Sequence, residues 1–186
     1  MNIPNLLTLA RIFLTPLLVW LLLGHDTKSA FCVFVFAGLT DALDGLLARV
    51  LNQKSRLGSF LDPMADKLLL VTSFIALWII PIRTVSIPAW LLFIAVGRDI
   101  VILSGSLALF LNKVRFEIRP LISSKLTTLF QLLVIFTVLG RSFFELPGWM
   151  YTMLFVVTAF FSVVSGWRYV SVGMAMYRLR GKSNTM

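Results

Sequence analysis

Residues 41–66 read DALDGLLARVLNQKSRLGSFLDPMAD and contain four aspartates: Asp41, Asp44, Asp62 and Asp66. Long apolar runs flank this stretch on both sides. Placing a charged side chain in a membrane span costs about 2.5–3.5 kcal/mol on insertion scales, so a group of acids needs a bound partner that offsets the cost. The sequence therefore predicts a binding site here, with divalent metal ions as its natural occupants.

The composition around this stretch predicts an all-α integral membrane protein. Of the 186 residues, 59% are hydrophobic and 13% are charged, and the mean hydropathy is +0.93. Soluble domains are much more polar. Since about 20 apolar residues span a bilayer, the length allows roughly six spans with short loops. We therefore expect residues 1–186 to form one domain, a six-transmembrane-helix bundle with a polar cavity on the cytosolic side.

Apolar runs and basic loops predict the topology. Basic residues gather in the loops 51–57 and 112–122 and in the C-terminal tail, while the opposite loops hold Lys28, Arg83 and Arg141. The positive-inside rule then makes both termini cytosolic. The first run lacks a basic n-region and a small-residue cleavage pattern, so we expect it to be retained and not removed as a signal peptide. The six predicted spans are residues 6–23, 30–50, 59–80, 88–111, 123–139 and 147–172.

The net charge of +9 does not indicate a nucleic-acid-binding protein. The cations cluster in loops beside apolar runs, as topology determinants and contacts for anionic lipid do. Cys32 is the one cysteine, so no intrachain disulfide is possible. Because His25 lies in a loop on the far side, no nitrogen or sulfur set for zinc is expected either.

The four aspartates are predicted to converge, because their two spans form a hairpin around the loop 51–57. At about 1.5 Å rise per residue, Asp44 and Asp62 reach similar depths, and Asp41 and Asp66 pair likewise one turn deeper. The two acids on each helix are three or four residues apart and share a face. Four carboxylates balance the charge of two divalent cations, and hard oxygen ligands suit Mg²⁺ or Mn²⁺.

Three small residues, Gly45, Ala48 and Gly58, accompany the acids. Two interpretations are open: they serve close helix packing, or their missing bulk lets a large ligand reach the metals. The neighbouring Arg49 favours a diphosphate ligand, because charge on the bridging and leaving oxygens must be neutralised in diphosphate chemistry.

The spacing D-x-x-D-G-x-x-A-R, eight residues, G-x-x-x-D-x-x-x-D resembles the signature of the CDP-alcohol phosphatidyltransferases at every fixed position. The resemblance implies that the four aspartates hold two divalent cations and that Asp66 is also the general base on the acceptor hydroxyl. It further implies a homodimer in a bacterial cytoplasmic membrane. The residues implied to line the CDP pocket are Gly45, Ala48, Arg49 and Gly58.

The implied reaction is attack of an acceptor hydroxyl on the lipid-bearing phosphorus of CDP-diacylglycerol, with CMP leaving. The N-terminal stretch NIPNLLTLAR, residues 2–11, resembles family members that make phosphatidylglycerolphosphate from glycerol 3-phosphate. Residues 124–128, SKLTT, lack the second lysine common in those members and are similar to members that make cardiolipin from phosphatidylglycerol. We rank glycerol 3-phosphate first and keep phosphatidylglycerol as the alternative acceptor.

Cations placed deeper than topology requires are candidates for acceptor binding. A charge in mid-span, as at Arg98, marks a functional site, and pairing with Asp99 is not expected because adjacent helical residues face apart. Lys125, Thr128 and Gln131 are expected to form a polar stripe toward the bundle interior, for which hydrogen bonding between helices is the alternative role. Such cations suit an anionic acceptor better than a neutral one. The predicted acceptor-binding residues are Arg98, Arg119 and Lys125.

Two other classes of protein also place acids inside a membrane bundle. A divalent-cation transporter would not explain the small residues and the arginine at fixed spacing beside the acids. A membrane prenyltransferase uses paired aspartate motifs, magnesium and a diphosphate donor, but such proteins resemble longer chains whose motifs lie on well-separated helices. Both remain distant alternatives to phosphatidyl transfer.

Overall fold

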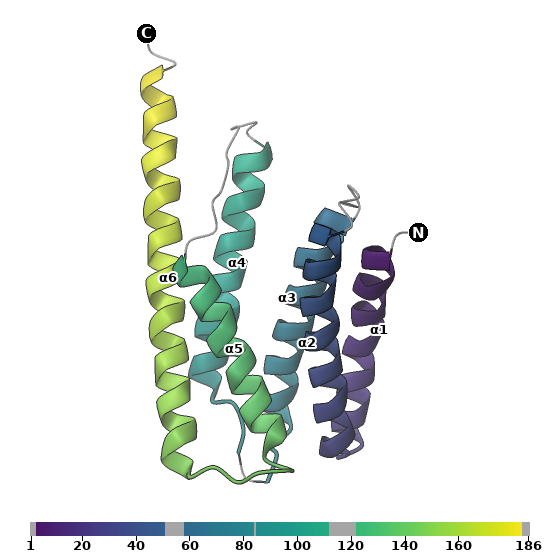
Figure 1. The fold of residues 1–186 in the computed structure, drawn as a ribbon. Coiled ribbons are helices and arrows are strands. Elements are labelled where there is room, and N and C mark those ends of the chain that lie inside the picture. Colours follow the sequence, from purple (N-terminus) through teal and green to yellow (C-terminus); the bar gives the residue numbers. More distant parts are fainter. Residues whose placement is uncertain (1–2, 51–57, 84, 112–121, 184–186) are drawn as a thin grey trace. The chain divides into compact units, whose positions relative to one another are not determined.

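The computed structural model describes the backbone of residues 3–50, 58–83, 85–111 and 122–183, and the side chains of residues 9–41, 65–83, 85–104 and 123–171. The described residues are almost entirely helical (Figure 1). The helices are α1 (Ile3–Leu23), α2 (Thr27–Val50), α3 (Gly58–Ile79), α4 (Ala89–Leu111), α5 (Ile122–Gly140) and α6 (Gly148–Ser183).

Each predicted apolar run corresponds to one of these helices, and the all-α prediction is confirmed for the described residues. The largest difference is at the end of α6, which continues to Ser183 although the apolar run ends at residue 172. The reason is local: the residues beyond 172 include methionine, alanine, leucine, arginine and lysine, all good helix formers, so helical backbone bonding continues after the apolar character ends.

The chain divides into two compact units. The first comprises Met1–Pro88 and Leu132–Tyr151, and the second comprises Ala89–Gln131 and Thr152–Met186. Because α5 and α6 each begin in one unit and end in the other, the units interleave along the sequence. The single domain stays a prediction.

In the first unit, α1 packs against both α2 and α3 (Figure 1). Its core side chains Leu18 and Leu22 are fully buried, as are Ala30 and Ala37 of α2. The small alanines allow the close helix approach typical of membrane bundles. α1 therefore contacts both helices of the hairpin and fixes their positions relative to each other.

Three connections meet at one end of the first unit. The hydroxyls of Thr27 and Ser142 are hydrogen-bonded to each other, and Arg83 pairs with Glu145 at 3.3 Å. Since Arg83 is 58% exposed and Glu145 75%, this ion pair adds little stability. The ion pair instead shows that the α3–α4 and α5–α6 connections lie together, and the Thr27–Ser142 hydrogen bond adds the start of α2 to them.

The turn between α1 and α2 is closed by local hydrogen bonds. The N–H of Gly24 donates to the Trp20 carbonyl, and His25 adopts a left-handed φ of 59° where α1 ends. Asp26 caps α2 by accepting a hydrogen bond of 3.1 Å from the Ser29 N–H. Hydrogen bonds from Ser29 hold the pKa of the Asp26 carboxyl below its usual value.

In the second unit, α5 and α6 are joined by aromatic and polar contacts. The rings of Phe130 and Phe161 stack with centroids 5.0 Å apart. The Thr127 hydroxyl lies 3.0 Å from the Phe161 carbonyl oxygen of α6 and also donates within its own helix. The fully buried Thr158, Ser162 and Ser165 give α6 a face of small side chains toward its neighbours.

Serine and threonine hydroxyls are mostly bonded within their own helices. The Thr158 hydroxyl donates to the Leu154 carbonyl at 2.7 Å, and Ser162 does the same to the Thr158 carbonyl. Such i to i−4 bonds satisfy a hydroxyl without a second helix. Further examples are Thr15, Thr128, Thr137 and Ser171.

The exposure of apolar and charged side chains is the reverse of what a soluble protein shows. Phe13, Phe93 and Trp167 are 72%, 69% and 73% exposed, while Arg11 and Arg98 are buried. Within the described side chains, Ser123–Gly140 and Gly148–Ser171 are long and apolar enough to cross a membrane. The structure thus agrees with a membrane protein, and the six spans remain a prediction.

An aromatic cluster holds the end of α5 against α2. The ring of Phe31 lies 5.1 Å from Phe136, 5.0 Å from Phe143 and 6.5 Å from Phe144, measured between centroids. Gly140 lies directly beneath this cluster, because a Cβ built on it would be 2.3 Å from Cζ of Phe144. The glycine is therefore what admits the Phe144 ring.

We predict that Gly140→Ala displaces Phe144 and lowers the free energy of unfolding by about 1–3 kcal/mol, the usual cost of overpacking. The matched control is Gly38→Ala in α2, where a Cβ would meet nothing within 4 Å. Thermal unfolding of the purified protein in detergent measures both. Equal melting temperatures for the two variants would contradict the assigned packing.

Candidate functional site

A buried guanidinium joins two of the four aspartates. Arg11 of α1 is 1% exposed and donates from Nη1 to Oδ1 of Asp66 on α3. Its Nη2 lies 2.9 Å from Oδ1 of Asp41 on α2. The two carboxylates are 51% and 41% exposed for Asp41 and Asp66, so each retains an open side. One side chain thus fixes acids from two helices while leaving them accessible.

The structure brings Asp41 and Asp66 together, as the hairpin argument predicts for this pair. Sequence reasoning missed Arg11 as a member of the site. The signal was present, because an arginine within an apolar run is by default a functional residue with an acidic partner. What the sequence did not provide was the packing of α1 across both α2 and α3.

Several predicted site residues lie outside the described side chains. Asp44 belongs to α2 and Asp62 to α3, each one turn nearer the loop 51–57 than its described partner. The convergence of all four aspartates therefore stays a prediction, as does the role of each as a metal ligand. The surroundings of Gly45 and Gly58, the side chains of Ala48 and Arg49, and the whole of Arg119 also lie outside the described part of the chain.

The described part of this site suits a divalent cation. Asp41 and Asp66 offer hard carboxylate oxygens, which Mg²⁺ and Mn²⁺ prefer. The contact with Arg11 shows that a positive charge is accommodated between them. The donor chemistry and the sign of the local charge therefore fit the predicted metals.

A second buried arginine lies in the second unit. Arg98 of α4 donates from Nη1 to Asp99 at 2.6 Å and from Nη2 to Ser124 of α5 and Ser165 of α6, at 2.6 and 2.8 Å. Gly166 of α6 lies beside the arginine side chain, and a Cβ there would make an ordinary van der Waals contact of 3.5 Å with Cγ of Arg98. Within the described side chains, Nε of Arg98 has no hydrogen-bond partner.

The expectation that Asp99 does not pair with Arg98 is wrong. Adjacent Cα–Cβ bonds do point apart on a helix, but the arginine side chain is long enough for its guanidinium to return to the neighbouring carboxylate. Both side chains are 4% exposed, and the pair is buried. Ser124 and Ser165 were not singled out as partners, because a serine in an apolar helix gives no signal by itself.

The predicted polar stripe on α5 is only partly correct. Ser123, Thr127 and Gln131 recur every four residues and are buried, whereas Lys125 lies on an exposed side of the helix. Lys125 and Thr127 are two positions apart on the helix, which turns their side chains to different faces. Lys125 thus does not lie on the buried face of α5 with Thr127 and Gln131. Its role in acceptor binding stays a prediction.

Comparison with known proteins gives a consistent result. Residues 1–167 match the family described as CDP-alcohol phosphatidyltransferase. The CDP-diacylglycerol–glycerol-3-phosphate 3-phosphatidyltransferase of Aquifex aeolicus is 38% identical over 130 residues, which is 70% of this chain and 71% of that protein. The protein of the same name from Bacillus subtilis is 32% identical over 187 residues, 91% of this chain and 94% of that protein.

A second group of relatives carries a different activity in its names. The cardiolipin synthase (CMP-forming) of Rattus norvegicus is 35% identical over 189 residues, which is 92% of this chain but 61% of the rat protein. The chain thus spans about three fifths of that relative.

We predict that Arg11→Gln lowers the free energy of unfolding by about 3 kcal/mol, at the low end for breaking a buried ion pair because both acids are half-exposed. Two carboxylates would then lie close together without their shared cation. Thermal unfolding with a chelator present measures the loss, and added Mg²⁺ should recover part of it. Arg83→Gln, which removes an exposed pair, is the control and should change stability by less than about 1 kcal/mol. Wild-type stability of Arg11→Gln in chelator would contradict the contact.

Proposed function

Because the chain belongs to the CDP-alcohol phosphatidyltransferase family, we propose that it transfers the phosphatidyl group of CDP-diacylglycerol to glycerol 3-phosphate and releases CMP. The observation that carries this proposal is the family match over residues 1–167, which includes all four aspartates. The relatives from Aquifex and Bacillus, which carry this activity in their names, support glycerol 3-phosphate as the acceptor.

In the proposed mechanism Asp66 takes the proton of the acceptor hydroxyl. The hydroxyl oxygen then bonds to the lipid-bearing phosphorus, the bond from that phosphorus to the bridging oxygen breaks, and CMP leaves with that oxygen. The half-exposed carboxylate of Asp66 is accessible to such a hydroxyl, and Arg11 holds it in place.

The four aspartates would hold two divalent cations, Mg²⁺ or Mn²⁺, which when bound would neutralise charge on the diphosphate. Arg11 contributes one further positive charge beside Asp41 and Asp66. The site would then carry a slight positive charge that favours an anionic donor. Gly45, Ala48, Arg49 and Gly58 are proposed to line the CDP pocket.

We assign the phosphate of the acceptor to Arg98, Lys125 and Arg119. Lys125 is exposed and accessible to an anion. Arg98 has an N–H with no partner among the described side chains, although Asp99 offsets its charge. This neutralisation makes Arg98 a weaker anchor for phosphate than its depth alone suggested.

The proposed setting is a six-span homodimer in a bacterial cytoplasmic membrane. Lys28, Arg83 and Arg141 are the few cations near the end where three connections meet. The richer basic loops, 51–57 and 112–122, alternate with these connections along the sequence, so the positive-inside rule favours a cytosolic position for those loops, the termini and the aspartates.

A second candidate function is cardiolipin synthesis, with phosphatidylglycerol as the acceptor. The similarity to the rat cardiolipin synthase over 92% of this chain favours it. The two candidates share the donor and the leaving CMP, and they differ in whether the acceptor is water-soluble or a lipid.

The acceptor is tested by assaying the purified protein with CDP-diacylglycerol, Mg²⁺ and either glycerol 3-phosphate or phosphatidylglycerol. We expect a phosphatidylglycerolphosphate product and CMP from the first mixture. Product from the lipid acceptor alone would favour cardiolipin synthesis. Turnover with neither acceptor, in protein that is folded by thermal unfolding, would contradict phosphatidyl transfer as the function.

We predict that Asp66→Asn lowers kcat by at least about 10²-fold, the lower range for loss of a positioned base. Binding of CDP-diacylglycerol, measured separately by displacement of a labelled donor, should be largely kept. Asp26→Asn, an acid in the turn between α1 and α2, is the control and should retain turnover. A near-normal rate for Asp66→Asn would remove it from its assigned role.

A further inference from the structure

A cation without an acidic partner lies where α5 meets α6 in the first unit. Arg141 directly follows α5, and its Cζ lies 5.4 Å from the centre of the Tyr151 ring of α6. A cation–π contact attracts the positive charge but does not neutralise it. The neighbouring acid Glu145 pairs with Arg83 instead, and within the described side chains Arg141 forms no ion pair. Its charge is therefore open to an anionic ligand.

The same two side chains carry buried hydrogen-bond donors that have no partner. These donors are Nε of Arg141 and the hydroxyl of Tyr151, which is a 3% exposed residue, and neither has an acceptor among the described residues. Folded proteins satisfy nearly all buried polar groups, because an unmet donor costs free energy. A ligand that supplies acceptor oxygens and negative charge would satisfy both. A phosphate group has these properties, and arginine binds phosphate through several N–H donors at once.

A second cation reaches this region from α2. The hydroxyls of Thr27 and Ser142 are hydrogen-bonded, so Lys28 and Arg141 are both sequence neighbours of that contact. Lys28 is exposed, and Asp26 offsets part of its charge. Arg141 is therefore the main anchor for an anion, and Lys28 adds to the attraction.

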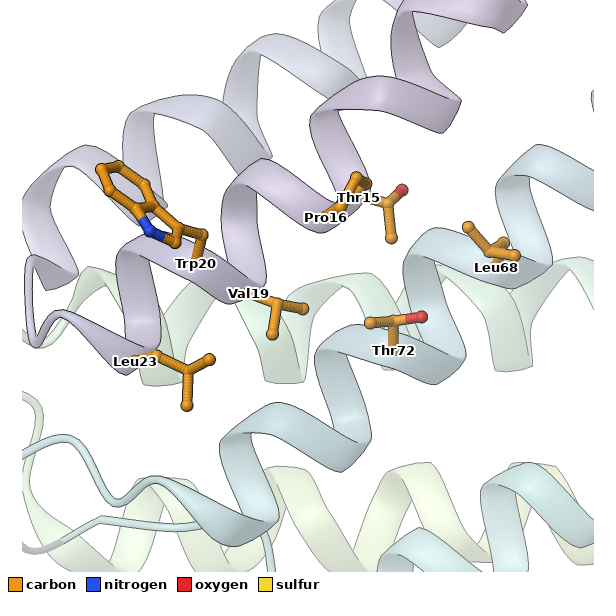
Figure 2. A pocket seen from close by; sticks show the side chains of 7 residues that line it. All are labelled: Thr15, Pro16, Val19, Trp20, Leu23, Leu68 and Thr72. Carbon is orange, nitrogen blue, oxygen red and sulfur yellow. The ribbon is translucent and has the colours of Figure 1, made fainter.

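Tryptophan side chains indicate that this region lies at a membrane surface. Trp149 comes two residues before Tyr151 and is 66% exposed. Trp20, near the end of α1, is 68% exposed, and Figure 2 shows its ring on the side of α1 away from Leu68 and Thr72 of α3. Exposed tryptophans near helix ends are typical of the boundary between hydrocarbon and headgroups. Since lipid phosphates lie at this level, a lipid is the nearest source of the anion.

We propose that Arg141, Tyr151 and Lys28 bind the phosphate of an anionic phospholipid. The guanidinium and the tyrosine hydroxyl donate hydrogen bonds to the phosphate oxygens, and the lysine contributes charge. Phe143 and Met150, which are 53% and 38% exposed, offer apolar surface close by in the sequence for the acyl chains of the same lipid.

This lipid site is distinct from the candidate functional site. Asp41 follows Thr27 by fourteen positions, which is about 21 Å along α2 at about 1.5 Å per residue. In the proposed topology the lipid site therefore faces the leaflet opposite to that of the aspartates. A lipid bound there would join α2, α5 and α6 and stabilise that end of the first unit, whichever acceptor the enzyme uses.

The test measures thermal unfolding of the full chain in nonionic detergent micelles with rising mole fractions of phosphatidylserine, at constant ionic strength. Phosphatidylserine is neither donor, acceptor nor product in either candidate function, so the result does not depend on turnover. We expect it to raise the Tm of the wild type by about 5 °C, the order expected for a ligand present well above its Kd. Arg141→Gln should raise the mole fraction that gives half of this shift at least about ten-fold, as loss of a charge-assisted contact does.

The matched control is Arg83→Gln, which removes another cation from the same end of the first unit. It should leave the half-shift mole fraction within about two-fold of wild type, since a twofold change is far below the effect of losing a charge-assisted contact. Two further arms identify the source of the anion: inorganic phosphate, and a neutral galactosyl diacylglycerol that has two acyl chains but no phosphate. Neither should reproduce the rise in Tm.

Tyr151→Phe keeps the ring and removes only the hydroxyl, so it decides the question even if Arg141→Gln does not fold. In micelles without phospholipid its Tm should equal or exceed that of wild type, because the hydroxyl has no partner among the described residues. With phosphatidylserine it should need about three-fold more lipid for half of the shift. A hydroxyl with a purely structural role would instead lower the Tm equally in both conditions, which would contradict the proposal.

Other outcomes would also overturn the inference. Equal half-shift mole fractions for Arg141→Gln and Arg83→Gln would assign the lipid effect to surface charge in general. An equal rise in Tm with inorganic phosphate would assign the site to a soluble anion, and an equal rise with the galactolipid would assign it to acyl chains alone. A wild-type Tm that phosphatidylserine does not change would remove the site.

Discussion

The bridge from Arg11 to Asp41 and Asp66 is the contact on which the first unit depends most. A guanidinium buried to 1% exposure is stable only with anionic partners, and here they come from two helices that α1 itself packs against. The same contact therefore sets the helix arrangement and holds a proposed metal ligand, Asp41, close to the proposed base, Asp66. The contact that holds α1, α2 and α3 together is thus also part of the candidate site.

The helices and part of the site were predictable from the sequence, for identifiable reasons. Each apolar run locates one helix, although α6 continues past its run to Ser183, and the antiparallel hairpin puts Asp41 and Asp66 at one depth. Arg11 was missed because hairpin geometry concerns sequence neighbours, whereas α1 packs across both α2 and α3. The Arg98–Asp99 pair was missed because rules for helix faces describe Cβ directions and not the reach of a long side chain.

The two buried arginines differ in their surroundings and in what that permits. Arg11 contacts carboxylates that are half-exposed, so its partners remain open to ligands. Arg98 is enclosed by Asp99, Ser124 and Ser165, and joins α4, α5 and α6. Burial depth alone, which the sequence suggests for both, does not distinguish an open charged site from a polar junction between helices.

The return of serine and threonine hydroxyls to carbonyls of their own helix has a consequence for biogenesis. Thr137, Thr158 and Ser162 need no partner helix, so α5 and the apolar part of α6 can enter the membrane one at a time from the translocon. The guanidinium of Arg11, by contrast, has no acidic partner within α1. Its two anionic partners exist only once α2 and α3 have been synthesised, so we expect α1 to reach its final packing after both of them.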